Sequence, residues 1–177
     1  MKLTVISAKQ SIALVLTLSA FFLSGCAGPK IASDLLSQTP VQESPIVDNG
    51  VKISVQINPR INNYEKIDQS VKESLRVALE TSNIFGTELA KPYQINANII
   101  TASQARMSFG SFEGTLEIIY TVTDEVGNEV LEKSIYTEAG SDRWYFYGAK
   151  RHRRARAVNI SENVLQFVEV LRAELGE

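Results

Sequence analysis

The clearest alternation of apolar and polar positions begins with four residues ahead of a proline. Val51, Ile53, Val55 and Ile57 are separated by single polar residues. A period of two is typical of a β-strand with one face on a core and the other in water. Because proline interrupts strand pairing, we expect this strand to end before Pro59.

A helical spacing follows this strand. Asn62 and Glu65 form a candidate capping pair ahead of it. Gly86 and Pro92 are expected to end the connection to the next strand. Apolar residues recur three and four positions apart through Ser82 and predict an amphipathic helix, with the stripe Ile67, Val71, Leu75, Ala78 and Leu79.

Alternation returns in three later runs, over residues 93–99, 116–122 and 131–139. The last two runs are joined by Asp124–Asn128, a sequence that favours a hairpin turn. A final helix is predicted over residues 149–175, with the apolar stripe Ala157, Val164, Val168, Leu171 and Leu175.

The predicted order is therefore β-α-β-β-β-α. Short strands with one wet face and two one-sided helices favour an α+β fold, a two-layer sandwich. We expect a mixed four-stranded sheet with both helices on one face, and a right-handed crossover between the first two strands. The segments at residues 107–114 and 140–148 would then share one end of the domain, and the preceding linker would enter at the other.

The beginning of the chain has the pattern of an export signal. Lys2 and Lys9 precede an apolar run over residues 12–23, which is shorter than the roughly 20 residues needed to cross a bilayer. The run ends in Leu23-Ser24-Gly25-Cys26, which resembles the lipobox of bacterial lipoproteins. The alternative is a structural or catalytic cysteine that happens to follow an apolar run.

The lipobox resemblance implies that residues 1–25 are a cleaved signal peptide and that Cys26 receives a diacylglyceryl group. Acylation of its new amino group would add another chain, and two or three acyl chains, palmitate among them, give a stable membrane anchor. The next residue is Ala27 and not Asp, which by resemblance to Gram-negative sorting favours the outer membrane. The location expected is lipid-anchored in the outer membrane with the domain in the periplasm.

Residues 26–50 hold three of the five prolines and no sustained apolar period. We interpret them as the lipidated cysteine and a flexible linker spanning roughly 25 to 30 Å, with at most local docking by Leu35 and Leu36. Residues 51–177 are then one periplasmic domain, long enough to bury a core without disulfides.

Composition excludes several kinds of chemistry. A formal net charge of −2 argues against a generally basic nucleic-acid binder, and one Cys with one His argues against a disulfide framework or a Cys/His zinc site. His152 could act as a general acid or base, but no catalytic or phosphate-binding motif accompanies it. Asp124 and Glu125 are interpreted as turn residues. We therefore expect no catalytic residue, metal or cofactor.

Two aromatic segments invite an interpretation as binding loops. One is Met107–Gly114, in which glycines accompany two phenylalanines, and the other is Arg143–Tyr147, which has four consecutive aromatic residues that cannot all face one core. They either cap the open end of the sandwich or contact a partner, because exposed aromatics bring a large area at low entropic cost. The candidate contact residues are Phe109, Phe112, Trp144, Tyr145 and Tyr147.

The run Lys150–Arg156 has six basic residues in seven positions. Cations at a helix N-terminus are unfavourable unless they are paired with acidic groups or a bound anion. In one interpretation Lys150 and Arg153 point toward the sheet and the run makes internal salt bridges with Glu113, Glu117, Glu138 or Asp142. In the other, the run binds an anionic lipid, a glycan or an acidic protein through Arg151, Arg153 and Arg154.

The predicted element order also resembles small periplasmic modules of envelope-assembly lipoproteins. Examples are the penicillin-binding-protein activators, the curli-secretion lipoprotein and the N-terminal domain of the Tol-system propeller protein. The expected function is a non-enzymatic adaptor that binds an envelope protein through its aromatic and basic residues. The alternatives are a carrier of lipid or glycolipid and a cell-wall hydrolase; no nucleic-acid partner is expected.

Overall fold

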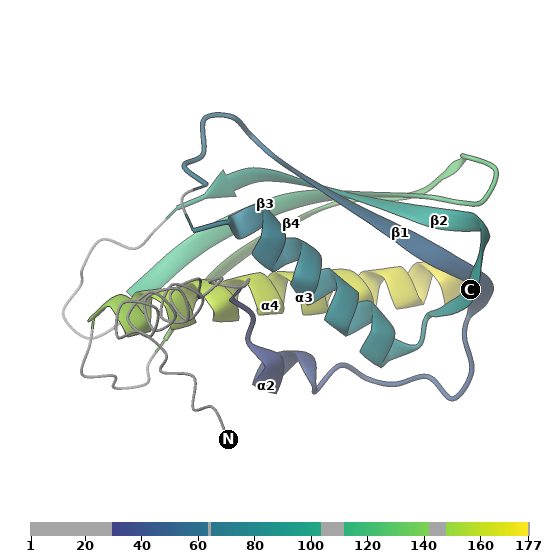
Figure 1. The fold of residues 1–177 in the computed structure, drawn as a ribbon, viewed down its shortest axis with the longest axis horizontal. Coiled ribbons are helices and arrows are strands. Elements are labelled where there is room, and N and C mark those ends of the chain that lie inside the picture. Colours follow the sequence, from purple (N-terminus) through teal and green to yellow (C-terminus); the bar gives the residue numbers. More distant parts are fainter. Residues whose placement is uncertain (1–29, 64, 104–111, 142–147, 177) are drawn as a thin grey trace, which may run out of the picture.

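The computed structural model describes residues 30–63, 65–103, 112–141 and 148–176 (Figure 1). It confirms the predicted element order and adds one short helix before the first strand. The elements are α2 (Ser33–Leu36), β1 (Val47–Ile57), α3 (Ile67–Ser82), β2 (Phe85–Ala102), β3 (Phe112–Thr123), β4 (Glu129–Ser141) and α4 (Gly148–Gly176).

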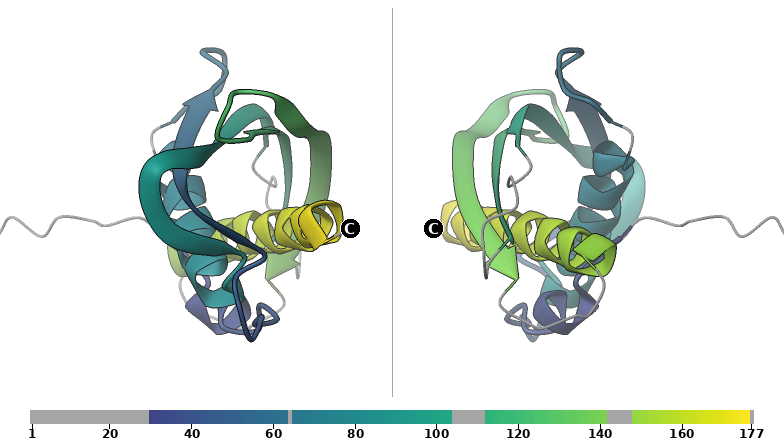
Figure 2. Two further views of the ribbon diagram at one scale, coloured as in Figure 1. Left: turned by 90° about the vertical axis from the view of Figure 1, so that its right-hand side faces the viewer. Right: turned by 90° about the vertical axis from the view of Figure 1, so that its left-hand side faces the viewer.

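The four strands form one mixed sheet in the order β1-β2-β3-β4. β1 and β2 are parallel, as the helical crossover through α3 requires, and the pairs β2-β3 and β3-β4 are antiparallel. The sheet arches over α3 and α4, which lie on its concave side (Figure 2). α3 packs against α4 and, within the sheet, mainly against β1, whereas α4 packs against β3 and β4. The α+β fold, with a mixed sheet and its two long helices on one face, is confirmed.

The core lies between this sheet and the two long helices. Its centre is an aromatic stack in which the rings of Tyr120 and Phe167 are 4.0 Å apart at their centroids. Both side chains are fully buried. Alternate residues of the central strands fill the space around them, including Ile95, Ala97, Ile99, Leu116, Ile118 and Val122. The period of two seen in the sequence therefore reports the core face of each strand.

The start of α3 differs from the predicted capping pair. The backbone N–H of Ile67 donates to Asn63 Oδ1 at 2.7 Å, and Asn63 Nδ2 donates to Asp68 Oδ1 at 2.8 Å. Lys66 takes a left-handed conformation just before the helix, with φ of 53°. Asn63 therefore accepts from the first N–H group of the helix, whereas the sequence had suggested Asn62 with Glu65 as the capping pair.

β2 begins eight residues earlier than its clean alternation at Tyr93. Its first half pairs with β1 through two register shifts, and Pro92 lies within this irregular part. A Cβ atom on Gly86 would stand 2.1 Å from the carbonyl oxygen of Asp48, so close strand approach requires glycine there. Gly86 and Pro92 thus belong to an irregular strand and do not end the connection.

Residues 30–46 differ most from the prediction, which placed them in a flexible linker. We call this segment the strap. It lies against α3 and α4, and the side chains of Ala32, Leu36 and Thr39 are buried beneath the helices. The docking expected of Leu36 occurs, but it belongs to a continuous packed segment. Only a few residues of the strap are buried, and they are not regularly spaced along the sequence. The hydrophobic pattern of the sequence therefore gave no sign that this segment packs against the helices.

Candidate binding end

Two strands end and two helices begin at the same end of the molecule. β1 and β2 finish there, while α3 and α4 begin there (Figure 1). Phe112 pairs with Ser141 across β3 and β4, so the two predicted aromatic segments are bounded by neighbouring residues at this end. The described ends of the two segments thus lie together, and residues 107–111 and 142–147 lie outside the described residues. We call this the binding end and define it by Lys30, the loop 58–66 and α4 residues 148–156.

Most of the candidate contact residues fall outside what the structure describes. Phe109, Trp144, Tyr145 and Tyr147 lie outside the described residues, and so does Cys26. For Phe112 and Arg151 the backbone is described and the side chain is not. The described part of the candidate site is therefore its cationic half.

Arg154 forms an ion pair between α4 and the strap. Its Nη1 donates to Asp34 Oδ1 at 2.8 Å, and its Nη2 donates to Asp34 Oδ2. Such a two-pronged pair fixes both the orientation and the separation of the groups. The internal salt-bridge interpretation therefore holds for Arg154, but its partner is a strap residue 120 positions earlier and not one of the carboxylates named from the sequence.

Glu65 interacts with two further residues of the basic run. The Nε of Arg156 is 3.5 Å from Glu65 Oε2, and Nδ1 of His152 is 3.4 Å from Glu65 Oε1. The Arg156 side chain is only 11% exposed. Desolvation lowers the pKa of Arg156 while the charge of Glu65 raises it, with a net lowering. Arg156 and Glu65 thus tie α4 to the loop that precedes α3.

Arg153 is exposed, which corrects the expectation that it points toward the sheet. Among the α4 residues whose side chains are described, Ala155 is the first that is buried. Arg153 therefore precedes the part of the helix that contacts the core. Lys30, Arg60 and Lys66 are also exposed at this end. Within the basic run Lys150–Arg156, His152, Arg154 and Arg156 therefore lie next to carboxylates, whereas Arg153 is exposed to solvent.

A buried polar network, which the sequence did not suggest, joins α4 to the sheet. Asn163 Oδ1 accepts from the Tyr120 hydroxyl at 2.8 Å, and Asn163 Nδ2 donates to the Ile135 carbonyl at 2.9 Å. Thr137 Oγ1 donates to Asn159 Oδ1 at 2.6 Å. The signal was available as two asparagines four positions apart within an apolar stripe.

This network fixes the position of α4 on the sheet and has no group that is suited to proton transfer. Burial raises the pKa of Tyr120, so its hydroxyl stays protonated and donates to Asn163. Asn159 Nδ2 completes the network by donating to the Gly114 carbonyl at 2.5 Å. Buried polar groups that all find partners fix one arrangement of neighbouring elements. The network therefore sets where α4 lies along β3 and β4.

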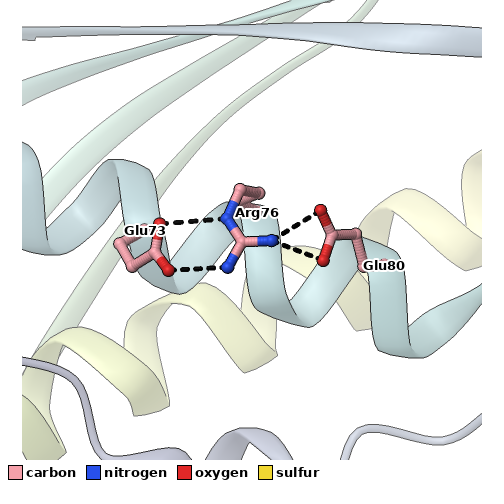
Figure 3. Close-up of polar contacts among 3 residues, drawn as sticks. All are labelled: Glu73, Arg76 and Glu80. Carbon is pink, nitrogen blue, oxygen red and sulfur yellow. Dashed lines mark hydrogen bonds and ion pairs between the residues drawn. The ribbon is translucent and has the colours of Figure 1, made fainter.

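The opposite end of the molecule is acidic. We define the acidic end by the end of the strap, the starts of β1 and β2, the β3-β4 turn and the C-terminal turns of α3 and α4. Arg76 lies toward it on the outer side of α3, where its charge is offset by Glu73 at 2.6 Å and Glu80 at 2.5 Å (Figure 3). Exposed carboxylates there are Glu43, Asp48, Glu88, Glu125, Glu129 and Glu174, and the exposed cation Lys91 lies among them.

Asp124 at the acidic end has the turn role expected of it. Its Oδ1 accepts from the backbone N–H groups of Val126 and Asn128, at 3.0 and 2.8 Å. Desolvation is the largest single influence and raises its pKa, but the hydrogen bonds from Asn128, Val126 and Gly127 together lower the pKa by more, so the net shift is downward. The carboxylate organises the turn and has the environment of a structural group.

The described residues hold no group of three or more His, Cys, Asp or Glu side chains arranged to bind a metal ion. Within the same residues, no helix combines the length and apolar character needed to cross a membrane.

Comparison with known proteins shows the fold of the chain and no more. No family model and no curated protein matches the sequence. Protein CT253 from Chlamydia trachomatis is similar in structure, with a TM-score of 0.51 at 9% identity over 72% of this chain and 98% of that one. Protein XCC0632 from Xanthomonas campestris, of the DUF330 family, has a TM-score of 0.53 at 10% identity over 77% and 91%.

A minor lipoprotein from Acinetobacter baumannii is more distant, with a TM-score of 0.45 at 10% identity over 68% of this chain and 91% of that one. At such identities a structural likeness speaks for the fold and not for activity.

Proposed function

We propose that this chain is a non-enzymatic lipoprotein, anchored in the outer membrane through Cys26, whose periplasmic domain acts as an adaptor in the cell envelope. The lipobox Leu23–Cys26 supports the anchor. A binding role is favoured over catalysis because the buried polar side chains of Tyr120, Thr137, Asn159 and Asn163 are engaged in structural hydrogen bonds.

The observation that carries the proposal is the convergence at the binding end. Exposed cations, namely Lys30, Arg60, Lys66 and Arg153, lie at the same end of the molecule as the boundaries of both aromatic segments. A charged rim beside apolar anchors is the composition of a recognition surface. In this proposal the anchors come from Phe109, Phe112, Trp144, Tyr145 and Tyr147, and the charge comes from Arg151 and Arg153, while Arg154 orients α4 through Asp34.

The anchor is tested by metabolic labelling with a fatty-acid analogue. The wild-type chain should incorporate the label and fractionate with the outer membrane. Cys26→Ser should abolish both, because the thiol is the attachment atom. Label retained in Cys26→Ser would contradict the lipoprotein assignment.

The binding end is tested by photo-crosslinking in intact cells. A photoreactive residue replaces Arg153, and the matched control replaces Gln56, which is exposed on the outer face of the sheet. A discrete adduct at position 153, absent at position 56, is the expected result. Equal adducts at both positions, or none at position 153, would remove the binding end as the functional surface.

A further inference from the structure

The strap determines where the membrane anchor joins the domain. At its beginning the backbone N–H of Lys30 donates to Ser70 Oγ at 3.2 Å, in the first turn of α3. At its far end the N–H of Gln42 donates to the carbonyl of Ser82, the last residue of α3, at 3.0 Å. The strap therefore runs about 18 Å along α3, from its beginning to its end.

This path reverses the entry point expected from the sequence. A linker that led directly to β1 would have approached the domain at the acidic end. Instead, the described chain begins beside the first turn of α3, and Asp34 contacts Arg154 near the start of α4. The chain enters the fold on the side of the binding end and reaches β1 only after crossing the helices (Figure 1).

The covalent tether is also short. Cys26 and Lys30 are four positions apart, so their Cα atoms can be separated by at most about 15 Å. A lipidated Cys26 would hold Lys30 within that distance of the membrane surface. The acidic end, at the other end of the strap, would lie farther away.

The charges follow the same axis. Lys30, Arg60, Lys66 and Arg153 are exposed on the side of the tether, where Asp34 and Glu65 already interact with residues of α4. The carboxylates of the acidic end are exposed on the opposite side. A surface of phospholipid phosphates attracts clustered Lys and Arg at short range and repels carboxylates.

We propose that the binding end docks on the anionic headgroups of the membrane that anchors the chain, with the acidic end and the outer sheet face turned toward the periplasm. This inference rests on lipidation at Cys26 and names the phospholipid phosphate as the ligand of the exposed cations. A protein partner of the adaptor would then be met next to the membrane.

The test uses the full lipidated chain, reconstituted in vesicles of phosphatidylethanolamine with a minority of phosphatidylglycerol. A photoreactive residue replaces either Lys66 at the binding end or Glu125 at the acidic end, both of which are exposed. Lipid adducts, identified by mass spectrometry, are expected at position 66 and should be several-fold fewer at position 125. Lipid adducts that are equal at both positions, or more frequent at position 125, would overturn the proposed orientation.

Charge reversal separates electrostatic docking from simple tethering. The triple variant Arg60→Glu/Lys66→Glu/Arg153→Glu should lower the docked-to-undocked ratio on the order of a hundredfold, with the photoreactive residue then placed at Asn62. The matched control, Lys52→Glu/Lys91→Glu/Lys133→Glu, makes the same charge change at exposed lysines elsewhere and should keep the adducts. Equal loss in both triples, or no loss in the first, would contradict headgroup binding.

The outcomes also separate this inference from the function on which it rests. Failure of Cys26 to take up the fatty-acid label would remove the anchor and the inference together. Labelled Cys26 with no lipid adduct at position 66 or 62 would overturn the docking and leave the lipoprotein assignment standing.

Discussion

The two halves of α4 are held to the rest of the domain by different forces. From Arg154 to Asn163 the helix adds ion pairs and buried hydrogen bonds to the core packing of Ile160, with partners in the strap, the loop before α3 and two strands. From Val164 to Leu171 it relies on apolar packing against the sheet. Apolar packing supplies most of the stability, whereas directional polar contacts fix one position and carry the charge that faces outward.

The largest effect should come from the apolar half. Phe167→Ala removes the ring that stacks on Tyr120 and leaves a cavity in the centre of the core. We expect the free energy of unfolding to fall by about 3 to 5 kcal/mol. Urea denaturation followed by circular dichroism measures it, with the exposed neighbour Gln166→Ala as the control. A loss similar to that of the control would mean that the apolar half does not dominate stability.

The buried network should come second. Asn163→Ala removes the acceptor of the Tyr120 hydroxyl and the donor to the Ile135 carbonyl, so both groups stay buried without that partner. We expect a cost of about 2 to 3 kcal/mol. In a double-mutant cycle with Tyr120→Phe, the combined loss should be smaller than the sum of the single losses. Strict additivity would show that the two side chains are not coupled.

The ion pair to the strap should matter less for global stability. Arg154→Ala breaks the contact with Asp34, whose side chain is 48% exposed, so we expect about 0.5 to 1 kcal/mol. The strap should nevertheless be cut faster in limited proteolysis, because this contact holds its beginning. Arg153→Ala changes the adjacent, exposed arginine and should leave both the stability and the cleavage rate nearly unchanged. Equal cleavage in the two variants would contradict the role of Arg154.

The same division explains what the sequence could predict. α3 spans the predicted residues Ile67–Ser82. This helix was predictable because its apolar stripe depends only on the spacing of residues that are close in sequence. The contact of Arg154 with Asp34 joins residues 120 positions apart, and no local period encodes such a choice of partner. The sequence suggested cations at one end correctly, but which of them are exposed depends on where the strap and the loop before α3 happen to pack.

The smallest effect should come from the acidic end, where the charges face solvent. The hydrogen bonds to Asp124 hold its pKa below the ordinary value, so its carboxylate favours the folded state at neutral pH. That contribution is complete above the pKa of the unfolded chain and disappears as the pH falls through the lower folded pKa. Asp124→Asn should therefore be slightly less stable than wild type near neutrality, and the difference in urea midpoint should shrink in acid. A difference that is as large as that of Asn163→Ala, or that grows in acid, would mean that this exposed turn holds the fold as the buried network does.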